Sequence, residues 1–142
     1  MKSVNPYLNF NGNTEEAFTF YQTVFGGDLH IDRYKDLSDN MGAEGNDLNK
    51  IANVMLYIGG GTMLFGSDVL GSSRENHSAG NNFYIQLETD CEEETARVFK
   101  NLSVGGTVQM PLANTDWAKQ FGMLTDKFGV QWMVFFEGGA AK

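Results

Sequence analysis

The chain has 142 residues, 42% of them hydrophobic and 13% aromatic, which is enough to bury the core of one ordinary domain. Ten Lys and Arg against eighteen Asp and Glu give a formal net charge of −8, so neither nucleic acid nor a membrane is an expected partner. The single cysteine, Cys91, excludes an intramolecular disulfide and suits a reducing compartment, and we therefore expect a cytoplasmic protein.

An internal repeat divides the chain into two halves. The strand-like segment 7–10 leads through an acidic turn and a helical pattern to Gly26-Gly27, and segment 84–87 leads through the same series to Gly105-Gly106. The second copy is two residues longer, and we expect the insertion in its helix or in the exit from it. The repeat predicts one domain over residues 1–142, with module one at about 5–68, a linker at 69–80 and module two at about 81–137.

The first module is predicted to be a βαβββ unit. Residues 7–11 alternate as a half-buried strand with Leu8 and Phe10 on one face, and a helix follows from Asn13 or Thr14 as far as the glycine pair. A long polar loop is expected at 36–49, and three further strands are expected near 28–34, 50–58 and 61–68.

The second module repeats that order, which predicts an α+β fold made of two βαβββ modules. A strand at 82–89 and a helix at 91–103 are followed by strands near 107–113, 120–126 and 130–136. Within the last strand Trp132 alternates with its neighbours toward the helix side, so we expect its ring to be buried beneath the helix.

Two motifs resemble those of the PhnB-like proteins. The opening motif is Asn11-Gly12-Asn13-Thr14-Glu15-Glu16-Ala17, then Phe20-Tyr21 and Val24-Phe25-Gly26-Gly27. The closing motif is Trp117 and Phe121-Gly122, then Thr125-Asp126-Lys127-Phe128-Gly129-Val130-Gln131-Trp132. PhnB-like proteins belong to the vicinal oxygen chelate superfamily, with glyoxalase I, bleomycin-resistance proteins and extradiol dioxygenases. The resemblance implies a glyoxalase-like fold in which the curved mixed sheets of the two modules form a half-barrel pocket, usually in a homodimer.

The resemblance also implies positions for a divalent metal, on the first and last strand of each module. These positions fall at Tyr7, Phe65, Tyr84 and Met133. Neutral phenol, phenyl and thioether groups are poor ligands for divalent first-row metals, so we expect no metal and no other cofactor. The alternative function is a metal-dependent lyase, isomerase or dioxygenase, and a divalent metal belongs only to that alternative.

Other candidate groups have simpler structural explanations. His30 and His77 are expected in surface or structural roles, and Cys91 is expected near a helix N-terminus. The glycine run 59–61 is expected to be a hairpin turn, because a dinucleotide site needs its glycine turn between a strand and a helix. For the same reason we do not expect the 3-demethylubiquinone methyltransferase label that some family members carry to describe this chain.

The strand registers predict a small-molecule site on the pocket face of the two sheets. Its predicted ligand-binding residues are Tyr7, Asn9, Phe65, Ser67, Tyr84, Gln86, Gln131, Met133 and Phe135. Apolar surface with a few hydrogen-bonding groups is typical of small-molecule pockets, so the expected function is metal-independent binding of a small molecule. A homodimer is also expected, because several apolar side chains are predicted to be exposed, namely Met41, Trp117, Phe121 and Met123.

Overall fold

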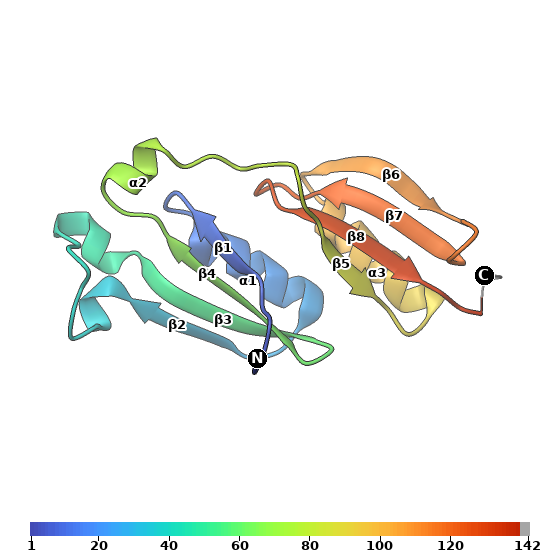
Figure 1. Ribbon diagram of the computed structural model, residues 1–142, viewed down its shortest axis with the longest axis horizontal. Helices are drawn as coiled ribbons and strands as arrows, with labels where there is room; N and C mark the ends of the chain where they lie inside the picture. The colour runs from blue at the N-terminus through green and yellow to red at the C-terminus, as the bar shows by residue number, and fades with distance from the viewer. Residues whose placement is uncertain (140–142) are drawn as a thin grey trace. The chain divides into compact units, whose positions relative to one another are not determined.

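The computed structural model describes residues 1–139, which form two compact units that divide between Ser78 and Ala79. The first unit contains β1 (Tyr7–Phe10), α1 (Thr14–Phe25), β2 (Leu29–Arg33), β3 (Ile51–Gly59) and β4 (Thr62–Asp68). The second unit contains β5 (Ile85–Glu88), α3 (Glu92–Ser103), β6 (Thr107–Ala113), β7 (Gln120–Thr125) and β8 (Gln131–Phe136) (Figure 1). The predicted α+β fold of two βαβββ modules is confirmed.

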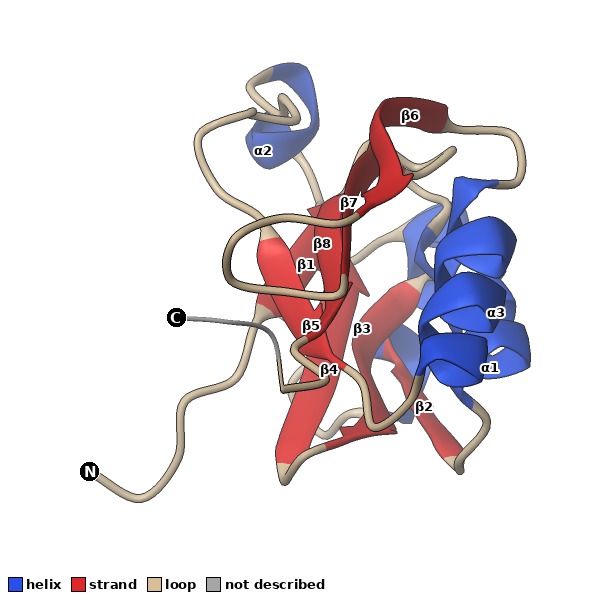
Figure 2. Ribbon diagram, turned by 90° about the vertical axis from the view of Figure 1, so that its right-hand side faces the viewer, coloured by secondary structure: helices blue, strands red, loops and turns tan. Residues whose placement is uncertain are grey.

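Each unit is built on a four-stranded mixed sheet. The strand order is β1-β4-β3-β2 in the first sheet and β5-β8-β7-β6 in the second. In both sheets the first strand runs parallel to the last, and the remaining pairs are antiparallel. The helix of each unit packs on one face of its own sheet (Figure 2). We call the opposite face of each sheet its front face.

The core of the first unit lies between α1 and the first sheet. Along α1 the fully buried residues Ala17, Phe18 and Tyr21 follow helical spacing, and they meet buried strand residues, namely Leu8, Phe10, Val54, Leu56 and Leu64. Gly66 lies directly beneath the helix, where an added Cβ would stand 2.7 Å from Cε1 of Phe18. The absence of a side chain at Gly66 therefore lets an aromatic ring of α1 reach the sheet.

The core of the second unit is centred on Trp132. Its side chain is fully buried, and its indole Nε1 donates a hydrogen bond to Oδ2 of Asp126 at 2.9 Å. Around it lie buried residues of α3 and of the neighbouring strands, among them Val98, Phe99, Leu102, Leu124 and Val134. The predicted burial of Trp132 on the helix side is confirmed.

Two segments contain short helices that the sequence did not predict. The predicted loop 36–49 holds the end of η1 (Tyr34–Asp36) and the 3-10 helix η2 (Gly45–Asn49), and the predicted linker 69–80 holds α2 (Ser72–Glu75). Asp47 links η2 to α2, because its carboxylate pairs with Nζ of Lys50 at 3.0 Å and with Arg74 at 2.6 Å. The hydrogen bond from Lys50, together with that from Arg74, lowers the pKa of Asp47.

The two-residue insertion of the second module lies outside its helix. Both α1 and α3 have 12 residues, so the insertion is not in the helix itself. One extra residue precedes the helix, and the other is Val104, which follows α3 before the glycine pair. The expectation of an insertion in the helix or its exit is therefore correct only for the residue at the exit. Two extra residues inside α3 would be about half a helical turn and would rotate its buried stripe away from the sheet.

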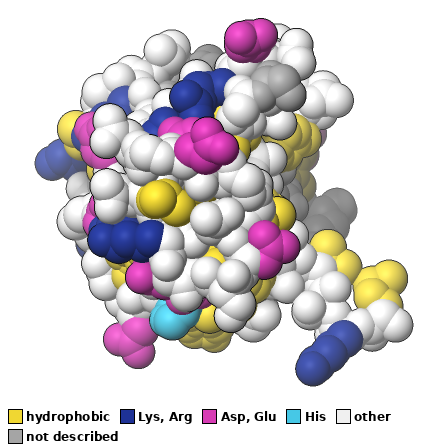
Figure 3. All heavy atoms as spheres, turned by 90° about the vertical axis from the view of Figure 1, so that its left-hand side faces the viewer, with side chains coloured by type: hydrophobic (Ala, Val, Ile, Leu, Met, Phe, Trp, Pro, Cys, Tyr) yellow, Lys and Arg dark blue, Asp and Glu magenta, His cyan; other side chains and the backbone are white. Residues whose placement is uncertain are grey.

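Charged side chains are mixed over the surface. On the face drawn in Figure 3, Lys and Arg lie among Asp and Glu rather than forming a continuous basic surface. Among residues 1–139, no helix has the length and hydropathy that crossing a membrane would require.

Candidate ligand-binding faces

On the front face of the first sheet, the strand register aligns four side chains across all four strands. Tyr7 pairs with Phe65, Phe65 with Met55, and Met55 with His30. The rings of Tyr7 and Phe65 are stacked, with centroids 6.3 Å apart and planes 8° from parallel. Half of the Tyr7 surface is exposed, so this row offers a flat aromatic surface to a ligand.

A polar row lies next to the aromatic row on the same front face. Asn9 pairs with Ser67 across β1 and β4, and Oγ of Ser67 donates a hydrogen bond to Oδ1 of Asn9 at 3.2 Å. Farther along, Nε2 of His30 lies 3.2 Å from Oδ2 of Asp32 on the edge strand β2. The structure thus brings all four site residues predicted in the first unit onto one face, although Ser67 is buried and presents little surface.

On the front face of the second sheet, four side chains form a hydrogen-bonded group that we call the polar cluster: Tyr84, Gln109, Thr125 and Gln131. The hydroxyl of Tyr84 donates to Oε1 of Gln109 at 2.7 Å. Nε2 of Gln109 donates to Oγ1 of Thr125 at 3.1 Å and to Oε1 of Gln131 at 3.4 Å. None of these side chains carries a charge at neutral pH.

Gln131 serves as a support within the polar cluster. Its side chain is buried, and its Nε2 donates a 2.6 Å hydrogen bond to the backbone oxygen of Phe83. That bond holds the segment before β5 against β8, while Oε1 of Gln131 accepts from Gln109, so both ends of this amide are engaged within the protein. Tyr84 lies just before β5, because that strand begins at Ile85 and not at residue 82 as predicted.

Gln109 is a site residue that the sequence analysis missed. The pairing of β6 with β7 shifts between Val108 and Met110, which leaves Gln109 as an extra residue in β6. A β-bulge of this kind can place two consecutive side chains on one face, and here both Gln109 and Met110 reach the front face. The only sequence signal nearby is Pro111, which favours an irregular edge strand.

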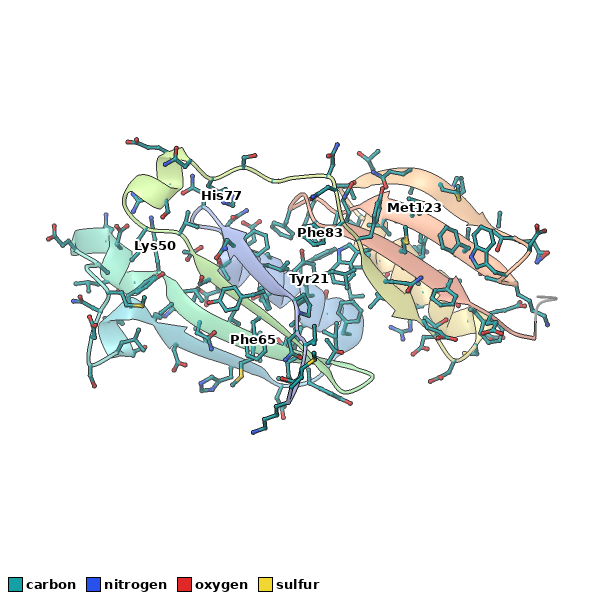
Figure 4. All side chains as sticks on the ribbon, in the orientation of Figure 1. Tyr21, Lys50, Phe65, His77, Phe83 and Met123 are labelled. Atoms are coloured by element: carbon teal, nitrogen blue, oxygen red, sulfur yellow. The ribbon has the colours of Figure 1, made fainter. Side chains whose placement is uncertain are left out.

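Beside the polar cluster lies a row of methionines that we call the thioether row. Met110 pairs with Met123, Met123 pairs with Met133, and Met133 pairs with Gln86. Figure 4 labels Met123 and, in the other unit, Phe65. The predicted residues Gln86 and Met133 are therefore neighbours on the front face of the second sheet.

An aromatic group completes this front face. Phe135 pairs with Phe121, whose ring meets that of Trp117 edge-on at a centroid distance of 5.5 Å. Trp117 is 56% exposed, as expected, and so is Met41 at 70%. The expected exposure of Phe121 is wrong, because β7 is an inner strand and the ring is covered by its neighbours.

The positions expected for a superfamily metal do not fit a divalent ion. Tyr7 and Phe65 are paired and stacked, with no strong donor between them. In the second sheet Met133 pairs with Gln86, so the residue on β8 that lies level with Tyr84 is Gln131. The predicted pair of metal positions, Tyr84 and Met133, is therefore two residues out of register. Within residues 1–139, no three His, Cys, Asp or Glu side chains lie close enough together to hold a metal ion.

The structure also places three other features that the sequence analysis considered. Cys91 is the exposed N-cap residue of α3, as expected. Glycines 59–61 form the hairpin turn between β3 and β4, also as expected. His77 lies in the segment after α2 and is partly buried (Figure 4).

Asp68 is a buried carboxylate whose role is structural. Its Oδ1 accepts hydrogen bonds from the backbone of Gly12 and Thr14 at 3.1 Å and from the hydroxyl of Thr14 at 2.6 Å. Its Oδ2 accepts one from the backbone of Ile51 at 2.9 Å, and its backbone oxygen accepts one from the hydroxyl of Tyr34 at 2.7 Å. Burial raises the pKa of Tyr34. These bonds occupy Asp68 on the helix side of the sheet, away from the front face.

Comparison with known proteins identifies the family. The sequence profile of the 3-demethylubiquinone-9 3-methyltransferase family, which includes the PhnB proteins, matches residues 2–135. The chain belongs to this PhnB-like family. The protein YjdN of Escherichia coli strain K12 is 32% identical to it over 143 aligned positions, covering 92% of each chain. The resemblance noted in the sequence is confirmed.

Solved structures of similar chains support the same assignment. Protein PA1353 from Pseudomonas aeruginosa is 36% identical, with a TM-score of 0.81 over 96% of this chain and 98% of that one. The PhnB protein from Bacillus cereus is 27% identical, with a TM-score of 0.73 over 95% and 99%. A glyoxalase/bleomycin resistance protein/dioxygenase family enzyme from Burkholderia phytofirmans PsJN, 14% identical with a TM-score of 0.62 over 94% and 99%, shows the fold alone. The PhnB-like chain therefore has the fold of the vicinal oxygen chelate superfamily.

Proposed function

We propose that this PhnB-like protein binds a small organic molecule against the front face of a sheet without using a divalent metal. The observation that carries the proposal is the polar cluster beside the thioether row: oriented, uncharged hydrogen-bonding groups next to partly exposed apolar side chains. Small-molecule sites commonly combine a mostly apolar surface with a few fixed polar groups.

The polar cluster favours a neutral polar group on the ligand. Gln109 has its amide nitrogen engaged by Thr125 and Gln131, while its Oε1 accepts from Tyr84 and retains a second lone pair. The hydroxyl oxygen of Tyr84 can itself accept a hydrogen bond. A ligand amide or hydroxyl can exploit both sites, whereas a carboxylate or phosphate would meet acceptors and no cation.

The front face of the first sheet offers a different contact. The stacked rings of Tyr7 and Phe65 provide area for a flat or apolar part of a ligand, and Asn9 lies beside them. The front face of the first sheet therefore offers mainly apolar contact area, whereas that of the second sheet offers fixed hydrogen-bonding groups.

We do not propose a methyltransferase activity, although the family name contains one. Binding of a nucleotide-like methyl donor in a doubly wound fold uses a glycine turn between a parallel strand and a helix. In this chain glycines 59–61 join two antiparallel strands, and each sheet contains one parallel pair. The topology therefore offers no turn of that kind at the glycine run.

A metal analysis separates this proposal from the alternative, a metal-dependent lyase, isomerase or dioxygenase. The protein is purified after growth with added Zn, Mn, Ni and Fe, and its metal content per chain is measured. Well below one equivalent of each metal, and no activity gained on adding them back, is the expected result. One tightly held equivalent would overturn the proposal in favour of the alternative.

A fragment screen by NMR tests ligand binding directly. Fragments carrying an amide or hydroxyl on an aromatic ring are expected to shift backbone amides next to the polar cluster. Gln109→Ala is expected to weaken that binding roughly tenfold, because it removes a fixed polar partner. The matched control is Glu93→Gln in the first turn of α3, which is exposed and should bind as the parent protein does. Equal affinity for the parent and the Gln109→Ala protein would overturn the placement of the site.

We also propose a cytoplasmic homodimer. Exposed apolar side chains such as Trp117 and Phe83 support association, since a second copy would remove them from water. Sedimentation equilibrium at micromolar concentration tests this. About twice the chain mass of 15.7 kDa is expected, and a mass that stays at 15.7 kDa at every concentration would rule the dimer out.

A further inference from the structure

Binding of a small molecule does not require that three neighbouring residues of the thioether row are all methionines. Met110, Met123 and Met133 occupy one rung of the second sheet on three neighbouring strands, β6, β7 and β8. The chain has seven methionines among its 142 residues, so three aligned on one rung form a marked local concentration of sulfur. Met110 is 44% exposed, and the other two are partly buried, so the row is open to solvent at its edge.

The spacing allows the three sulfur atoms to meet. Neighbouring strands lie about 4.8 Å apart, so the Cα atoms of the outer two methionines are separated by roughly 10 Å. Methionine is unbranched and has three rotatable side-chain bonds, so both outer side chains can lean toward the central Met123. The bulge at Gln109 is what turns Met110 to this face.

We propose that Met110, Met123 and Met133 form a binding site for one Cu(I) ion. Thioether sulfur is a soft, neutral ligand that selects Cu(I) and is a poor partner for Zn²⁺ or Mg²⁺. A monovalent cation at this site would also be favoured by the net charge of −8 and by Glu88, on the strand that flanks β8.

This site shares only Met133 with the metal positions that the superfamily implies. Those positions lie on the first and last strand of each module, whereas the thioether row runs along one rung of a single sheet and includes the inner strand β7. The site also does not depend on the proposed binding of a small molecule, because its ligands are the three sulfur atoms alone.

The test uses Ag(I), which shares the preference of Cu(I) for sulfur and does not change oxidation state, and then Cu(I) kept reduced without oxygen. All proteins carry Cys91→Ser, since the exposed thiol of Cys91 would compete for either ion, and serine is a good N-cap residue. NMR of ¹³C-labelled methionine methyl groups reports each of the seven residues separately. The methyl signals of Met110, Met123 and Met133 are expected to shift together and to saturate at one ion per chain, while Zn²⁺ leaves them in place.

Substitution by leucine separates coordination from packing. Met123→Leu keeps the size and the apolar character of the side chain but removes the central sulfur, so affinity for Ag(I) should fall by more than roughly tenfold. Met41→Leu, in an exposed segment outside the sheets, should leave affinity unchanged. Unchanged Ag(I) affinity in Met123→Leu, or methyl shifts spread equally over all exposed methionines without saturation, would overturn the proposal.

Discussion

In the first unit a buried carboxylate holds the start of α1, whereas in the second unit hydroxyl groups hold the start of α3. Asp68 receives three hydrogen bonds from the chain around Gly12 and Thr14, more than 50 residues away in sequence. In the second unit, Oγ1 of Thr89 and Oγ1 of Thr95 lie 2.5 Å apart, and Thr95 also donates to the backbone oxygen of Cys91. Asp68 pairs with Phe10 across β1 and β4, and the equivalent pair of the second unit is Val134 with Leu87. The second unit therefore has no carboxylate at this position.

Packing differs between the two units at an equivalent rung as well. Gly66 lies opposite Leu8, and Trp132 lies opposite Ile85. In the first unit the large ring at this rung is Phe18 of the helix, and the strand has only Gly66. In the second unit the large ring is Trp132 of the strand. A repeated order of strands and helix therefore preserves which face is buried but leaves open which element fills the space.

The largest expected effect comes from removing the ring of the second unit. Trp132→Ala leaves a cavity and removes the hydrogen bond to Asp126, and should cost about 3–5 kcal/mol of the free energy of unfolding. Urea denaturation followed by the fluorescence of the remaining Trp117 measures it in the second unit. Trp132→Phe, which keeps an aromatic ring, is the matched control and should cost less. A midpoint equal to that of the parent protein would contradict the packing described for this unit.

A smaller loss is expected from the carboxylate of the first unit. Asp68→Asn replaces one accepting oxygen with an NH₂ group that faces donors, and should cost roughly 2–3 kcal/mol. Amide hydrogen exchange at α1 measures the loss where it arises, with α3 as the internal reference. Equal acceleration of exchange in both helices would contradict a role confined to the first unit.

The corresponding change in the second unit should be milder. Thr95→Val removes a hydroxyl at nearly constant volume, and neutral hydrogen bonds of this kind contribute about 1 kcal/mol. The same exchange measurement, now at the start of α3, provides the comparison with Asp68→Asn. If Thr95→Val proved the more damaging of the two, the contrast between carboxylate and hydroxyl anchoring would fail.

The smallest effect is a change in pH dependence within the first unit. Burial raises the pKa of Tyr34 above its ordinary value of about 10, so the folded protein holds this proton more tightly than the unfolded chain does. Stability from this group is present below pH 10 and is lost as the pH rises above it. In Tyr34→Phe, the decline of the denaturation midpoint between pH 9 and 11 should therefore be shallower than in the parent protein. Parallel curves for the two proteins would show that Tyr34 does not contribute to that decline.

The sequence by itself determined those features that depend on near neighbours along the chain. The alternation of apolar and polar residues predicted the strands and the burial of Trp132. The glycine pairs marked the ends of the helices, and the repeat predicted two βαβββ modules. The front-face positions of Tyr7, Asn9, Gln86 and Met133 also followed, because alternation assigns side chains to faces without knowledge of the partner strand.

Only the tertiary structure decided which residues of different strands meet. Gln109 joined the polar cluster through a bulge that exists only in the pairing of β6 with β7, and Phe121 was buried because β7 lies inside its sheet. The donors to Asp68 and the alignment of Met110, Met123 and Met133 depend on register between strands. The register between two strands is fixed only when distant segments pack together. The pattern of residues within one segment does not indicate which residue of another strand will lie opposite.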